Sequence, residues 1–113
     1  MDQQPHEPSA APAPDGKTQV IAQTSGLRVV EYVLQPGETL PWHHHSEVTD
    51  RFYCLEGLIG VELRTPAQNL LLHPGESCSV APGLVHRSGN AATGVSRYLL
   101  VQGVGCYDFV TAG

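Results

Sequence analysis

The chain has 113 residues, which is enough for one domain with a single hydrophobic core. Apolar residues make up 41% of the chain and charged residues 15%, a composition that favours a folded domain over a disordered chain. The formal net charge is −5, and the few basic residues form no stripe, so no nucleic-acid partner is expected.

The N-terminal segment, residues 1–18, is rich in proline and alanine and contains His6. It has too few apolar residues to offset the entropy lost on ordering, so we expect a disordered tail and one domain over residues 19–113. The segment does not have the pattern of a secretory signal, and no stretch approaches the ~20 apolar residues of a membrane span. The sequence therefore predicts a cytoplasmic protein without a membrane partner.

From residue 18 onward, short runs rich in β-forming residues alternate with turn signals such as Pro36-Gly37, Pro74-Gly75 and Pro82-Gly83. The predicted strands cover residues 18–24, 27–34, 40–46, 50–57, 58–65, 69–73, 77–81, 95–102 and 106–110. No run of ten or more residues keeps a 3.6-residue period without interruption. The pattern predicts an all-β sandwich or small barrel with little or no helix.

A histidine run at positions 43–45 lies in one of these strands. Side chains alternate along a strand, so His43 and His45 face one way, about 7 Å apart. Asp50 and His86 are candidates for the remaining ligands of a metal ion. Such a set suits one divalent transition metal: Fe, Mn, Ni, Zn, Co or Cu. From spacing alone, a surface pair or an adventitious chelator is also open.

Other potential ligands have simpler interpretations. His73 precedes a Pro-Gly turn and is expected to be an exposed turn residue. The three cysteines, Cys54, Cys78 and Cys106, are odd in number and widely spaced, so we expect buried, reduced thiols.

Two segments resemble the motifs of the cupin superfamily. The first motif has a glycine, a His-x-His pair, an acidic residue and a second glycine, which correspond to Gly37, His43, His45, Asp50 and Gly57. The second motif is matched by Gly75, Gly83, His86 and Asn90, while Ala81 replaces its proline. The resemblance covers residues 37–90 and implies a double-stranded β-helix, also called a jelly-roll barrel.

The resemblance further implies that His43, His45 and His86 bind a metal and that Asn90 is structural. Asp50 stands where the family has glutamate. Because aspartate is one methylene shorter, Asp50 either binds the metal directly, binds it through water, or acts as a base. Glu47 lies nearby, but its spacing does not fit the motif.

Strand parity assigns further residues around Asp50. Phe52 and Cys54 share its face, whereas Arg51 and Tyr53 point outward. On the later strand, Tyr98 and Gln102 are candidate polar pocket residues and, with Asp50, candidate catalytic residues. A core tyrosine with a satisfied hydroxyl is the alternative for Tyr98.

Cupins differ widely in function, so the fold alone does not fix the reaction. We expect a small metalloenzyme acting on a small oxygenated organic metabolite, by isomerase, lyase or dioxygenase chemistry. The alternatives are a non-catalytic ligand-binding or sensor module with a structural metal, and a metal-free relic. We also expect a homodimer, because outward apolar residues such as Leu55 and Trp42, and open sheet edges, require cover. The run at 19–22 would add a strand to the neighbouring copy.

Overall fold

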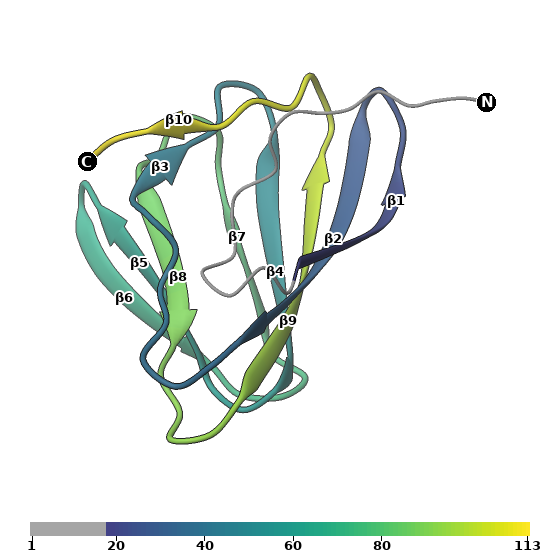
Figure 1. The fold of residues 1–113 in the computed structure, drawn as a ribbon. Coiled ribbons are helices and arrows are strands. Elements are labelled where there is room, and N and C mark those ends of the chain that lie inside the picture. The colour runs from purple at the N-terminus through teal and green to yellow at the C-terminus, as the bar shows by residue number, and fades with distance from the viewer. Residues whose placement is uncertain (1–17) are drawn as a thin grey trace.

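The computed structural model describes residues 18–113, which form two antiparallel sheets packed face to face (Figure 1). The strands are β1 (Thr18–Gln23), β2 (Leu27–Leu34), β3 (His43–His44), β4 (Thr49–Glu56), β5 (Ile59–Arg64), β6 (Ala67–Leu72), β7 (Ser77–Val80), β8 (His86–Asn90), β9 (Ser96–Gly103) and β10 (Val110–Thr111). No helix occurs in this part of the chain, so none there is long and apolar enough to cross a membrane. The predicted all-β fold is confirmed.

One sheet has the strand order β1-β2-β9-β4-β7, and the other has the order β10-β3-β8-β5-β6. Neighbouring strands in each sheet are often distant in sequence, as expected for a jelly roll. Residues 1–17 of the predicted tail, which covers residues 1–18, lie outside the described residues. β1 begins at Thr18, the last residue assigned to that tail, and pairs with β2 of the same chain.

The core fills the space between the sheets because alternate residues point inward. On β2, every second side chain from Arg28 to Leu34 is buried, and β9 shows the same alternation from Ser96 to Gln102. Successive rows across β2, β9 and β4 are therefore mostly apolar, and Tyr32 stacks on Tyr98 with ring centroids 5.0 Å apart. At one end of the sheet, the row turns polar.

Glycines of the motif shape the turns between these strands. Gly37 and Gly57 both adopt a φ of +81°, in the left-handed region that other residues avoid. At Gly57 space is also limiting, because a Cβ atom would lie 2.1 Å from Ser96 Oγ. Asn90 supports the same region, since its amide donates to Leu34 O and Gly94 O. These contacts agree with a structural role for Asn90.

Most of the parity assignments hold, but several other sequence expectations do not. The predicted strand at 40–46 is reduced to the two residues of β3, and Cys78 is only partly buried. Arg51 and Tyr53 are exposed, while Phe52 is buried. The predicted strand at 106–110 is wrong for most of its length, because β10 contains only Val110 and Thr111. Cys106 in that segment is exposed, contrary to the expectation of a buried thiol.

Candidate metal centre

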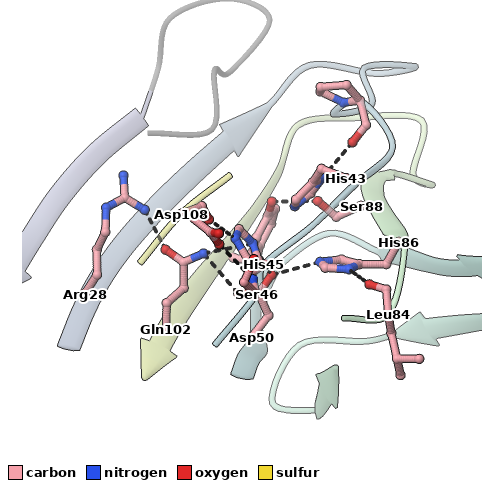
Figure 2. Close-up of polar contacts among 12 residues, drawn as sticks. Arg28, His43, His45, Ser46, Asp50, Leu84, His86, Ser88, Gln102 and Asp108 are labelled. Atoms are coloured by element: carbon pink, nitrogen blue, oxygen red, sulfur yellow. Dashed lines mark hydrogen bonds and ion pairs between the residues drawn. The ribbon is translucent and has the colours of Figure 1, made fainter. Parts of the chain in front are cut away.

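The polar end of the barrel brings the four predicted metal ligands together. His43 on β3 and His86 on β8 are direct cross-strand partners, and Asp50 comes from β4 in the opposite sheet. His45 follows β3 and faces the same way as His43. One ligand atom from each of these four buried residues lies within 4.8 Å of the others. The motif residues thus form a single cluster enclosed between the two sheets (Figure 2).

Backbone carbonyls fix the orientation of all three imidazole rings. The Nδ1 atoms of His43 and His86 each lie 2.8 Å from the carbonyl oxygen two residues earlier in the chain. His45 Nδ1 makes the same kind of contact with Asp108 O. Because a carbonyl oxygen only accepts, each Nδ1 carries a proton and donates it. The Nε2 atom of each ring is therefore the nitrogen that faces the cluster.

Asp50 presents one oxygen to these nitrogens. Its Oδ2 atom lies 2.9 Å from His86 Nε2 and 3.1 Å from His45 Nε2. A carboxylate oxygen and two imidazole nitrogens have lone pairs in the same small volume, so a proton or a cation must lie among them. The other oxygen, Oδ1, accepts a hydrogen bond of 3.0 Å from Gln102 Nε2.

The cluster also controls protonation of its members. Burial lowers the pKa of His43 to about 4, and the neighbouring histidines act in the same direction. Burial likewise disfavours the charged form of His45, but hydrogen bonding to Asp50 and its negative charge outweigh this and raise the His45 pKa. For Asp50, the hydrogen bonds from His45 and His86 outweigh burial and lower the pKa. Without a metal, Asp50 is thus an anion whose charge favours the protonated form of His45.

The donor set fits a first-row divalent metal. Three imidazole nitrogens and one carboxylate oxygen match the preferences of Zn, Fe, Mn, Co, Ni and Cu, whereas Ca and Mg prefer mostly oxygen ligands. The carbonyl contacts at Nδ1 also have the arrangement usual for histidines that bind metals. The residues present therefore could hold such an ion.

The C-terminal strap, residues 104–112, covers the cluster. The Phe109 ring stacks on His43 with centroids 4.4 Å apart, and the Tyr107 ring lies 5.4 Å from His45. The side-chain Oδ1 atom of Asp108 accepts a 2.7 Å hydrogen bond from Ser46 N, which anchors the strap to the residue after His45. Sequence patterns do not predict this role for the strap residues. The aromatic residues at 107 and 109 are the available signal, but the pattern there predicts a strand.

The other candidate residues have different surroundings. Gln102 lies against the cluster, since its Nε2 is 3.3 Å from His45 Nε2. Tyr98 lies two inward-facing positions before Gln102 on β9, further from the cluster, and its hydroxyl is 2.7 Å from Ser88 Oγ. His73 is exposed and pairs with Glu76, as expected for a turn residue. Arg28, which no motif indicated, is buried beside Gln102.

Comparisons with known proteins agree with this architecture. The model of the cupin domain family matches residues 30–102. The chain therefore belongs to the cupin superfamily. Among curated proteins, no sequence gives a significant match.

Solved structures with the same fold include an uncharacterised Klebsiella pneumoniae protein with a double-stranded β-helix domain. It aligns with a TM-score of 0.75 and 21% identity, over 95% of this chain and 90% of that one. KdgF from Halomonas sp. aligns with a TM-score of 0.68 and 20% identity, over 78% and 77% of the two chains. An oxalate oxidase aligns with a TM-score of 0.69 and 18% identity over 77% of this chain, which spans only 46% of the oxidase chain. At such identities the similarity establishes the fold alone.

Proposed function

We propose that this cupin binds one divalent transition metal through His43, His45, Asp50 and His86, and acts as a small metalloenzyme on an oxygenated organic metabolite. The observation that carries the proposal is the convergence of three Nε2 atoms and one carboxylate oxygen, with each Nδ1 atom committed to a backbone carbonyl. A surface pair of histidines would have neither this burial nor these fixed orientations.

A divalent metal held by this set supplies Lewis acidity to a carbonyl, enolate or carboxylate oxygen of a bound molecule. If each of the four residues supplied one atom, two positions of a six-coordinate metal would remain for that molecule or for water. The chain's own residues contribute orientation and exclusion of water: the strap covers the cluster, and Gln102 offers an N–H group beside it. Asp50 is an anion at neutral pH because its pKa is lowered, so it would serve the site as a charged ligand and only as a weak proton acceptor.

Metal analysis of the protein purified without added metal tests the ligand assignment. We expect about one metal ion per chain in the wild type and a large loss in His86→Ala. The matched control is His73→Ala, which removes an exposed histidine far from the motif and should keep the metal. Equal metal content in the wild type and His86→Ala would overturn the proposal.

A non-catalytic ligand-binding or sensor module is the second candidate. The observation that favours it is the close cover over the cluster, where Phe109 and Tyr107 pack on the histidine rings. Water-proton relaxation of the Mn²⁺-loaded protein separates the two functions. Strong enhancement indicates an exchangeable position for substrate and supports the enzyme, whereas no enhancement indicates a closed, structural metal.

We extend the proposal to a cytoplasmic homodimer that takes a small-molecule ligand. Exposed apolar side chains support an interface, among them Leu55 and the edge-strand residues Val20 and Ile21. Light scattering at micromolar concentration tests this part, since a monomer would contradict it.

A further inference from the structure

Arg28 is a buried cation with an unusual position. Its side chain is only 2% exposed, and among residues 18–113 no carboxylate lies within salt-bridge distance of it. Its guanidinium lies over the Tyr107 ring, 4.6 Å from the centroid, and its Nε atom has no hydrogen-bond partner. Burying a charge without a counterion lowers the stability of the fold, so an apolar residue in this space would give a more stable fold.

The register of the sheet connects Arg28 to the candidate metal centre. Arg28 on β2, Gln102 on β9 and Asp50 on β4 are direct cross-strand neighbours, and all three point inward. Arg28 Nη1 donates a 2.5 Å hydrogen bond to Gln102 Oε1, and Gln102 Nε2 donates one of 3.0 Å to Asp50 Oδ1 (Figure 2). The three side chains form one hydrogen-bonded row that ends at the metal ligand.

The chemistry of arginine fixes the direction of this row. A guanidinium only donates hydrogen bonds, so the oxygen of the Gln102 amide must face Arg28 and the NH₂ group must face Asp50. In the flipped amide, two oxygens would meet at Asp50 and two sets of N–H groups would meet at Arg28. Arg28 and Asp50 thus both require the amide orientation in which Gln102 presents its NH₂ group to the cluster.

The consequence falls on Asp50. Its Oδ1 atom is occupied by the Gln102 amide, which leaves Oδ2, the atom beside His45 Nε2 and His86 Nε2, for a cation. The neutral amide also separates the guanidinium from the carboxylate. A direct Arg28–Asp50 ion pair would compete with the metal for the negative charge, whereas the relay through Gln102 orients the carboxylate and leaves its charge available.

We propose that Arg28 is a positioning residue that, acting through Gln102, holds Asp50 as a metal ligand with a single oxygen. The inference rests on the proposed function, because it concerns how this chain prepares a ligand for the metal. It also accounts for how the shorter aspartate serves where the family has glutamate: the row across the sheet sets its orientation.

Cobalt(II) binding tests the proposal without relying on activity, since the visible spectrum of bound cobalt reports its ligands. The variants are Arg28→Met, Gln102→Leu and their combination. Each single change should weaken cobalt binding by about 10- to 100-fold and alter the visible bands, as for other residues that orient metal ligands. The double variant should lose little more cobalt affinity than the single variant with the larger loss, because both residues act along one path.

Two further variants separate positioning from general stability. Arg28→Lys keeps a group that only donates, so it should restore much of the wild-type spectrum and affinity. Arg97→Met removes an exposed arginine from the same sheet and should leave both unchanged. Circular dichroism checks that each variant is folded. If Arg28→Met does not fold, Arg28→Lys and Gln102→Leu still test the proposal.

Two results would overturn the inference while leaving the proposed function intact. One is wild-type cobalt binding and spectrum in Arg28→Met, and the other is additive losses of affinity in the double variant. If the wild type itself takes up no cobalt while folded, the proposed function fails, and the inference fails with it.

Discussion

Metal uptake is expected to release a proton from His45 at any pH where that ring is protonated, because a metal and a proton compete for its Nε2 atom. In the metal-free protein, Asp50 holds the pKa of His45 above its ordinary value of 6.5. The pKa of His43 is lowered to about 4 by burial, so at neutral pH its Nε2 atom carries no proton that a metal would displace. Asp50 hydrogen-bonds to His45 but acts on His43 only through its charge, and this contributes to the difference in pKa between the two histidines.

The sign and size of the effect follow from linkage. Below the His45 pKa, the affinity for metal should fall about tenfold for each pH unit, or roughly 1.4 kcal/mol, through this group. Above that pKa, His45 adds no pH dependence. Because the folded-state pKa is raised, the His45–Asp50 contact stabilises the metal-free fold fully below about pH 6.5 and loses this effect as pH rises through the folded-state pKa.

Asp50→Asn is the perturbation that tests the cause. Without the carboxylate, the strongest influence that raises the His45 pKa is lost, while burial still lowers the pKa and Asp108 still raises it, so the pH-dependent range should move to lower pH. At pH 8, where competition by protons is weak, the loss of an anionic ligand should still lower the affinity by at least about tenfold.

Competition with a chromophoric zinc chelator between pH 5.5 and 8.5 measures the affinity, and calorimetry in two buffers of different ionisation enthalpy counts the protons. The same pH profile in the wild type and Asp50→Asn would refute the assignment of the proton to the His45–Asp50 contact.

Three further predictions concern the cover, the thiols and the turns. Phe109→Ala should speed chelator-driven metal loss about tenfold, because the strap loses roughly 1.4 kcal/mol of ring stacking; an unchanged rate would show that the strap does not limit access. Cys106 is exposed and should react rapidly with a thiol reagent at pH 8, whereas partly buried Cys78, with a pKa raised to about 11 by burial, should react on the order of 10² times more slowly; equal rates would contradict this difference in environment. Gly37→Ala should cost about 1–2 kcal/mol of stability from its positive φ, and Gly57→Ala at least about 1 kcal/mol more from crowding; urea denaturation showing equal costs would oppose this.

Local rules predicted much of the fold and of the ligand cluster. Side-chain alternation placed His43 and His45 on one face, and the same rule separated buried Phe52 from exposed Arg51. These assignments need only the two-residue period of a strand and the positions of turns, and both can be recognised within one short stretch of sequence.

Long-range register could not be predicted in the same way. Arg28 lies on the inward face of its strand, yet only the pairing of β2 with β9 and of β9 with β4 reveals that it reaches Asp50 through Gln102. The strap was missed for a different reason. Its aromatic residues are typical of a strand, but only two residues of the segment pair with β3. The position of the strap is set by ring contacts with His43 and His45.

X-ray absorption spectroscopy of the metal-loaded protein tests the central claim most directly. We predict only nitrogen and oxygen ligands at about 2.0–2.2 Å, with the scattering of three imidazole rings, and two rings in any metal retained by His86→Ala. A sulfur ligand near 2.3 Å, or fewer than three imidazoles in the wild type, would contradict the proposed centre.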